Sequence, residues 1–241
     1  MSYSMNINLA KNIDINKMTF SEMKKNDYGG GSLYVNYENR PLIIQTPYMS
    51  TPFGVSVFEP NDGGPAKYSL DLSFRDEETN KSVNSLLTML NAFDDKLIKE
   101  GLKNSLQWFK TKHTSAEVIK ALYSSQVRYS INRETGEVNT QYKPTFKVKV
   151  PYHKDKCNVE VYNEEKERVE FEHLDEVVGK GSKVRAILSC TGVWFAGGKF
   201  GVSWRILHLQ AKGGNVLQNF AFHDETDDEN DEDGEEYDEN M

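Results

Sequence analysis

The sequence predicts a mainly β protein, an antiparallel barrel that carries a helical insertion. Segments with an apolar residue at every second position recur at short spacing, which is typical of half-buried strands. Apolar residues spaced three and four positions apart are confined to about residues 79–124, which predicts helices grouped in one insertion. The sequence ends in a strongly acidic stretch without apolar periodicity, which predicts a disordered tail.

Three regions follow from these patterns. Residues 1–30 are polar and rich in Asn and Lys, so we expect a flexible N-terminal arm with one short helix near Phe20 to Lys25. Residues 31–223 form the barrel domain with its insertion, and residues 224–241 form the tail. No apolar run approaches the roughly 18 residues that span a membrane. No basic segment followed by an apolar one opens the sequence, so we expect an intracellular protein.

The early strands are expected before the insertion. Alternation is clearest at Tyr68, Leu70, Leu72 and Phe74, which follow a turn signal at residues 61–65. We expect strands over residues 33–37, 42–46, 53–58 and 68–74.

Helical periodicity then runs from Val83 through Leu90 to Ile98, and alternation returns at Val127. The later strands are expected over residues 127–131, 146–150, 159–161, 169–171, 184–190 and 200–206, with 159–161 and 169–171 forming a hairpin. After Ile206 the apolar phase shifts by one residue, which predicts a β-bulge.

Charge is unevenly distributed along the chain. The net charge is -8, from 29 basic and 37 acidic residues, but twelve of the acidic residues lie between Asp224 and Glu239. Without them, 25 acidic residues face 29 basic ones, so the body carries about +4.

An acidic tail can serve solubility alone. Behind a basic body, we interpret it as a tail that mimics a polyanion and binds partners. The tail residues assigned to this role are Asp224, Glu225, Asp227, Asp228, Glu229, Asp231, Glu232, Asp233, Glu235, Glu236, Tyr237, Asp238 and Glu239.

The sequence contains no enzyme signature. Around Gly197 and Lys199, Phe200 stands where a phosphate-binding loop has Ser or Thr. Cys157 and Cys190 are too few for a disulfide scaffold and are expected to be ordinary thiols. We therefore expect a protein that is not an enzyme and uses no cofactor and no metal.

Basic residues share strand faces in three pairs. An even spacing places both members of a pair on one side of a strand. The pairs are Lys147 with Lys149, Lys183 with Arg185, and Lys199 with Arg205. A basic sheet face can follow a phosphate backbone, although exposed lysines on strands also protect against aggregation. For one pair alone, protection against aggregation is the better explanation, whereas three pairs on neighbouring strands support nucleic-acid binding and protection about equally.

Aromatic residues near these strands could stack on bases. Alternation places Trp194 and Trp204 on the apolar face and Phe195 on the other, so Phe195 is the main stacking candidate. A bulge near Gly192 would exchange Trp194 and Phe195. The predicted DNA-binding residues are Lys147, Lys149, Tyr152, Lys183, Arg185, Phe195, Lys199 and Arg205, with Tyr142, Lys143, Trp194 and Trp204 as further candidates.

The segment from Ser182 to Gln210 resembles the replicative single-stranded DNA-binding proteins of nucleo-cytoplasmic large DNA viruses. Its characteristic runs are 183–188, 192–195 and 199–204. Those proteins are similar to the binder of T-seven-type phages, which also ends in an acidic tail. The resemblance implies an OB-fold that coats single strands in viral DNA replication and recombination, at a replication site in the host cytoplasm or nucleus. The phage family ends its tail in an aromatic residue, whereas this chain ends in Met241.

We therefore predict a sequence-independent single-stranded DNA-binding protein. Its tail would compete with DNA and recruit replication proteins such as a polymerase or a helicase-primase. A homodimer is left open, and no membrane partner is expected. The alternative is an acidic-tailed chaperone or assembly factor for basic proteins such as histones, with the tail as its binding site.

Overall fold

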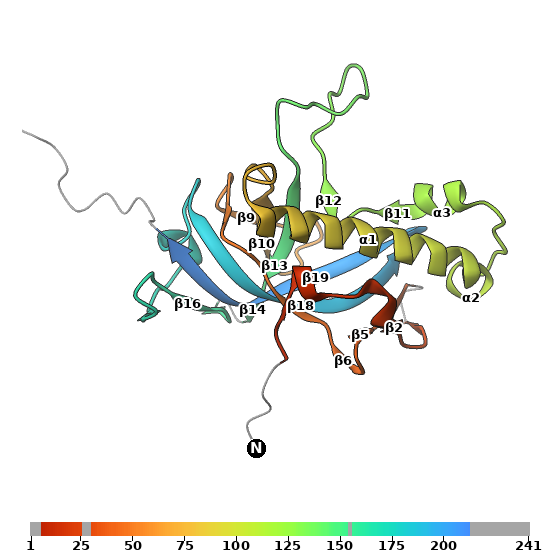
Figure 1. Cartoon of the computed structure of the whole chain (residues 1–241), viewed down its shortest axis with the longest axis horizontal. Coiled ribbons are helices and arrows are strands. Elements are labelled where there is room, and N and C mark those ends of the chain that lie inside the picture. Colours follow the sequence, from red (N-terminus) through yellow and green to blue (C-terminus); the bar gives the residue numbers. More distant parts are fainter. Residues whose placement is uncertain (1–5, 26–29, 154–155, 213–241) are drawn as a thin grey trace, which may run out of the picture.

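The computed structural model describes residues 6–25, 30–153 and 156–212. These residues form a mainly β protein with a helical insertion, as predicted (Figure 1). None of the helices in these ranges is long and apolar enough to cross a membrane. The helices are α1 (Lys81–Lys103), α2 (Ser105–Phe109) and α3 (Ala116–Leu122), with single 3-10 turns at Ala10–Asn12, Ile15–Lys17 and Leu174–Glu176. The strands are β1 (Asn8–Leu9), β2 (Met18–Phe20), β3 (Lys24–Lys25), β4 (Gly31–Leu33), β5 (Val35–Tyr37), β6 (Arg40–Pro41), β7 (Ile43–Gln45), β8 (Met49–Ser50), β9 (Val55–Phe58), β10 (Lys67–Ser73), β11 (Tyr123–Ser124), β12 (Val127–Arg128), β13 (Thr145–Val150), β14 (Tyr152–His153), β15 (Lys156–Cys157), β16 (Glu160–Tyr162), β17 (Arg168–Val169), β18 (Lys183–Ala196) and β19 (Lys199–Lys212).

Five strands close into a ring. β18 pairs with β8, β8 with β10, β10 with β13, β13 with β19, and β19 again with β18. All of these pairs are antiparallel except β13–β19, which is parallel and meets at Lys149 and Arg205. A barrel of five strands is the architecture of the OB-fold. The long hairpin of β18 and β19 contributes two of the five strands.

The barrel is filled by the apolar positions of its strands. Val184, Ala186 and Leu188 of β18 are buried, as are Leu70 of β10 and Val148 of β13. These positions follow the alternation that the sequence shows, because successive side chains of a strand point to opposite faces. The predicted bulge after Ile206 is also present, as a register shift between β18 and β19.

Helix α1 lies across the barrel (Figure 1). Its buried apolar residues form one stripe along the helix. Val83, Leu90 and Leu97 are buried in the same core as the strands, because residues three and four apart share one face of a helix. The side chain of Asn80 accepts hydrogen bonds from the first free backbone N–H groups, which determines where the helix begins.

Residues 6–25 do not form the flexible arm and the short helix predicted there. β2 pairs with β5 and β3 pairs with β4, and Ala10 and Met18 are buried. The strands have only two or three residues each, too few for a recognisable period. Their order comes from tertiary pairing, which local sequence patterns do not encode.

Candidate nucleic-acid interface

A groove opens on the outer face of the barrel where β10, β13 and β19 meet. Its cavity has a volume of about 750 Å³. Five basic residues line it, and none of the lining residues is Asp or Glu. The basic residues are Lys67 from β10, Arg128 from β12, Lys147 and Lys149 from β13, and Arg205 from β19. The groove is therefore a concave surface of one charge sign.

Most of these cations have no anionic partner among the residues that the structure describes. Lys147 forms an ion pair with Asp71, with Nζ and Oδ2 2.6 Å apart. Lys67, Lys149 and Arg205, like Arg128, form no ion pair with any carboxylate in the part of the chain that the structure describes. Burial lowers the pKa of Lys149, and the positive charge of Lys67 lowers it further. The groove thus holds positive charge that an external anion could neutralise.

Aromatic rings lie among the cations. Tyr68 and Tyr152 stack with ring centroids 3.8 Å apart and an interplanar angle of 18°. Phe58 is 61% exposed, with Lys67 Nζ 5.9 Å from its ring centroid. Burial raises the pKa of Tyr152 to about 12, so its hydroxyl is neutral at physiological pH. Together with the half-buried Trp194, these rings offer apolar faces beside the basic residues.

The floor of the groove is tied to helix α1 by a buried polar network. Trp204, only 1% exposed, donates its indole N–H to Gln126 Oε1. Gln126 Nε2 donates to Asp94 Oδ1 over 2.6 Å, and Asp94 also accepts from the hydroxyls of Tyr123 and Ser125, each at 2.6 Å. Burial raises the pKa of Asp94, and these hydrogen bonds act against that shift. Asp94 therefore links α1 to the segment that forms one wall of the groove.

Trp194 and Phe195 have exchanged the positions that alternation assigned them. Thr191 is an extra residue in β18, since Cys190 faces Trp204 and Gly192 already faces Ser203. Beyond this bulge the alternation is reversed. Trp194 therefore lines the groove, where a Cβ at Gly201 would lie 2.9 Å from its Cζ2, so the glycine leaves room for the indole.

Phe195 is wrong as a stacking candidate, because it is buried. Its ring centroid lies 5.4 Å from that of Trp108 and 5.7 Å from that of Phe200, on which it stacks. The ring belongs to an aromatic cluster between the β18–β19 hairpin and α2. Trp204 is in the core, as alternation predicted, although its edge also borders the groove.

The three basic pairs do not meet at one site. The groove contains Lys147, Lys149 and Arg205, together with Tyr152. Lys183, Arg185 and Lys199 lie outside it. A strand of 14 residues extends about 45 Å, so residues on the same face of β18 or β19 can lie far apart.

Each of the three outlying cations contacts another group. Lys183 Nζ lies 3.8 Å from Asp76 Oδ2, and Lys199 Nζ donates to the backbone oxygen of Ala121 over 2.6 Å. The guanidinium of Arg185 lies 5.1 Å from the ring centroid of Tyr48 and lines a second cavity.

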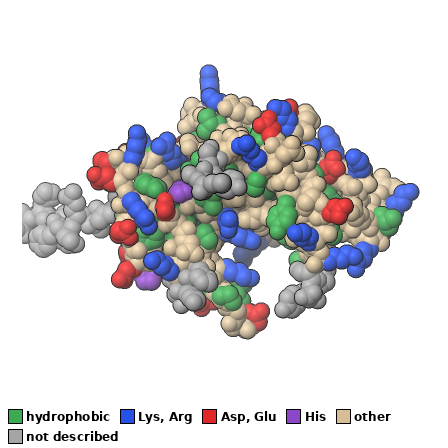
Figure 2. Space-filling view, turned by 90° about the horizontal axis from the view of Figure 1, so that it is seen from below, with side chains coloured by type: hydrophobic (Ala, Val, Ile, Leu, Met, Phe, Trp, Pro, Cys, Tyr) green, Lys and Arg blue, Asp and Glu red, His purple; other side chains and the backbone are tan. Residues whose placement is uncertain are grey.

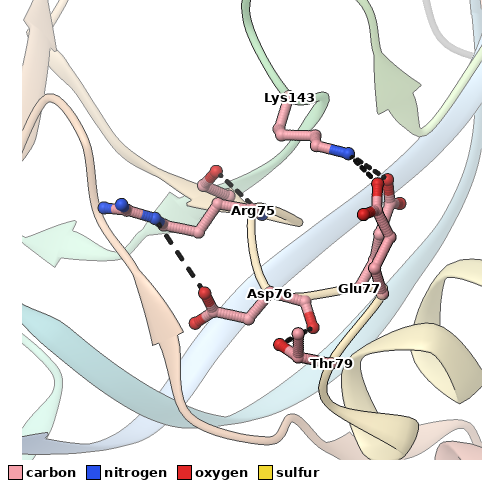
Figure 3. Close-up of polar contacts among 7 residues, drawn as sticks. Arg75, Asp76, Glu77, Thr79 and Lys143 are labelled. Carbon is pink, nitrogen blue, oxygen red and sulfur yellow. Dashed lines mark hydrogen bonds and ion pairs between the residues drawn. The ribbon is translucent and has the colours of Figure 1, made fainter.

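The loop between β12 and β13 carries the remaining candidates. Tyr142 is 59% exposed there and does not line the groove. Lys143 lies between two carboxylates, with Nζ 3.2 Å from Glu77 Oε1 and 2.5 Å from Glu78 Oε1 (Figure 3). Lys143 therefore anchors the loop to the segment before α1.

Sequence patterns did not identify Lys67, Arg128, Phe58 or Tyr68 as site residues. Lys67 and Tyr68 begin β10, directly opposite the Lys149 strand, with Tyr68 facing Val150. Pairing the predicted strand 68–74 with 146–150 would have indicated them. Arg128 comes from a two-residue strand that alternation cannot locate.

The charge distribution is visible on the surface. Figure 2 shows Lys and Arg side chains along the whole length of the face seen from below, with Asp and Glu side chains between them and several at the end that carries β16. Residues 6–25, 30–153 and 156–212 contain no group of three or more His, Cys, Asp or Glu that could bind a metal. Cys157 and Cys190 are buried free thiols. The predicted tail residues 224–241 lie outside the described ranges.

Comparisons with known proteins give one family and several remote structures. A family model described as a family of unknown function (DUF5871) matches residues 71–224. The single-stranded DNA-binding protein of bacteriophage Enc34, solved in complex with ssDNA, is 14% identical, with a TM-score of 0.45 over 80% of this chain and 96% of that chain. The single-stranded DNA-binding protein gp2.5 of bacteriophage T7 is 13% identical, with a TM-score of 0.37 over 82% of this chain and 100% of that chain. No curated protein matches the sequence.

Proposed function

We propose that this chain, which belongs to the family of unknown function DUF5871, binds single-stranded DNA in its basic groove without reading the base sequence. One observation carries the proposal. Five basic residues and no acidic residue line the groove, four of the five have no ion pair among the described residues, and aromatic rings lie between them. DNA phosphates would pair with these basic residues, and the rings would provide surfaces on which bases stack.

The aromatic rings favour a single strand over a duplex. In a duplex the base faces are covered by neighbouring pairs, whereas an unpaired base can stack on an exposed ring. Trp194 and Phe58 both have exposed surface in or beside the groove. Because every base has a π face, this mode of binding does not discriminate between sequences.

The acidic tail extends the proposal. Its twelve negative charges are tethered to the body, so they act at high effective concentration against DNA phosphates. A tail displaced by DNA would then be available to recruit replication proteins. The resemblance of residues 182–210 to viral single-strand binders supports a role in viral DNA replication at an intracellular site.

Binding assays with matched oligonucleotides test the proposal. A gel-shift with single-stranded and double-stranded DNA of one sequence should show tighter binding of the single strand. The variant Lys149→Ala/Arg205→Ala should weaken that binding. The control Lys11→Ala/Lys99→Ala removes the same charge from exposed positions outside the groove and should bind as the wild type does. Preference for the duplex, or equal losses in the two double variants, would refute the groove as a single-strand site.

A further inference from the structure

A second cavity lies on the outer face of the same hairpin. It has a volume of about 340 Å³, and the residues that matter for its chemistry are Tyr162, Lys166, Arg185, Ile187 and His208. We propose that this cavity is a second DNA subsite, which takes the nucleotides that leave the groove along the same single strand. The inference rests on the proposed function and adds to it a path for the DNA.

The strand register connects the two cavities. Arg205, which lines the groove, faces Ser189 of β18, and Ile187, two residues before Ser189, faces His208 in the second cavity. Residues two apart on a strand lie on one face, about 7 Å apart. Partners in register also share a face. The groove and the second cavity therefore lie next to each other on one continuous sheet surface, with the pair Ser189–Arg205 at the groove and the pair Ile187–His208 at the second cavity.

The half-buried Ser189 lies between the two cavities. Ser189 pairs with Ile43 of β7 on one side and with Arg205 on the other. The surface between the two cavities is therefore the face of a continuous sheet. An extended strand leaving the groove at Arg205 reaches the second cavity without crossing backbone.

The cavity is suited to a phosphate. The Arg185 side chain is oriented by Nε, which donates to Gln210 Oε1 over 2.7 Å, and by the Tyr48 ring 5.1 Å from its guanidinium carbon. Gln210 is held in turn by the backbone oxygen of Asn163, 2.7 Å from its Nε2. A guanidinium oriented in advance loses less entropy when its remaining N–H groups bind an anion. Neither Arg185 nor Lys166 forms an ion pair with a carboxylate in the described ranges.

The cavity also presents two rings to a base. The centroids of Tyr162 and His208 lie 6.3 Å apart at 38°. Both rings bond to Glu160, since the Tyr162 hydroxyl donates to Oε2 at 2.8 Å and His208 Nδ1 lies 3.2 Å from the same oxygen. Glu160 therefore orients the rings without lining the cavity. The second cavity therefore combines two basic residues with two rings, which is the same kind of composition as that of the larger groove.

The test is the dependence of affinity on oligonucleotide length. Single strands of about 4 to about 16 nucleotides cover the range of OB-fold site sizes. The subsite variant Lys166→Glu/Arg185→Ala should bind the shortest strands as the wild type does and lose about tenfold or more on the longest. The groove variant Lys149→Ala/Arg205→Ala should lose affinity at every length. Lys99→Glu controls for charge reversal alone.

The outcomes separate the two proposals. Wild-type affinity of the subsite variant at every length, with the groove variant impaired, would refute the subsite and leave the groove intact. An equal loss at all lengths would refute a separate subsite as well. Full binding by the groove variant would refute the proposed function itself. Since Lys166 is exposed, the single variant Lys166→Glu tests the subsite even if Arg185→Ala destabilises the fold.

Discussion

The indole N–H of Trp204 donates to the side-chain oxygen of Gln126, directly beneath the groove. Gln126 can accept this bond only because its amide nitrogen points the other way, toward Asp94. Through Asp94, helix α1 therefore fixes the position of Gln126, and Gln126 in turn holds the indole of Trp204 at the floor of the groove. The orientation of the amide is set by two elements, β19 through Trp204 and α1 through Asp94.

Replacing Gln126 with Leu should leave the buried indole N–H of Trp204 without its partner and remove one of the hydrogen bonds that Asp94 accepts. We expect a loss of about 1 to 3 kcal/mol in the free energy of unfolding, measured by urea denaturation. Single-strand affinity should fall as well, because the wall at residues 124–126 loses the hydrogen bond from the Gln126 side chain to Asp94 of α1. The control Gln141→Leu changes an exposed glutamine and should stay within about 0.5 kcal/mol of the wild type. Wild-type stability of Gln126→Leu would show that the network contributes nothing.

Trp194→Ala should weaken single-strand binding by about 1 to 3 kcal/mol while the protein stays folded, because the ring lines the groove. Phe195→Ala should instead destabilise the fold by about 3 to 5 kcal/mol, since it removes a buried ring from an aromatic cluster. Fluorescence titration and thermal unfolding of both variants measure the two effects. If Trp194→Ala destabilises the fold and Phe195→Ala only weakens binding, the bulge does not lie at Thr191.

Salt dependence reports the number of phosphate contacts. For single strands the log–log slope falls by about 0.7 for each contact. Lys149→Ala and Arg205→Ala should each make the slope shallower by roughly that amount on any base sequence. Lys99→Ala, on α1 outside the groove, should leave the slope unchanged. Slopes that match the wild type in both groove variants would mean that neither side chain meets a phosphate.

The lowered pKa of Lys149 gives binding a pH dependence. A phosphate near Nζ favours the charged form, so the pKa rises on binding and the complex takes up a proton. Affinity should therefore fall as the pH rises from neutrality toward 10.5, the ordinary lysine value. Lys149→Arg, which does not titrate in this range, should flatten the curve at constant ionic strength. A curve identical to that of the wild type would exclude Lys149 as the titrating group; Lys99→Arg is the control.

Deletion of residues 224–241 removes twelve negative charges and should tighten single-strand binding, most strongly at low salt, where the attraction is least screened. The same truncation should weaken binding to replication partners. The test compares the DNA affinity of the full-length and truncated forms at low salt, and circular dichroism verifies that both are folded. Equal or weaker DNA affinity of the truncated form would contradict competition by the tail. If the protein binds histones and loses them on truncation, the chaperone alternative gains support.

Sequence periodicity identified the elements whose patterns are long enough to read. Helix α1 and the alternating parts of β10, β13, β18 and β19 are of this kind, and their buried residues were predicted correctly. The pattern misplaced Trp194 and Phe195 because one inserted residue reverses every later position of the strand. Whether Thr191 is inserted depends on pairing with β19 and β4, which lies outside any local window.

The composition of the groove could be predicted only in part for a similar reason. Lys147 and Lys149 share a strand, so their common face is readable from spacing. Lys67 and Arg128 join them only when the barrel closes and brings residues about 20 to 80 positions away to β13. Closure of the ring also separates Lys183 and Arg185 from the groove, although they share a strand with Trp194.

The bulge in β18 depends on Gly192. Its φ of +117° is one that side chains rarely adopt, and a Cβ there would collide with the backbone oxygen of Leu33 on β4. Loss of a single codon, that for Thr191, would restore unbroken alternation, placing Phe195 outside and Trp194 inside. A deletion of one residue would therefore exchange which of the two aromatic rings lies at the groove, and Gly192 permits the bulge that turns Trp194 there.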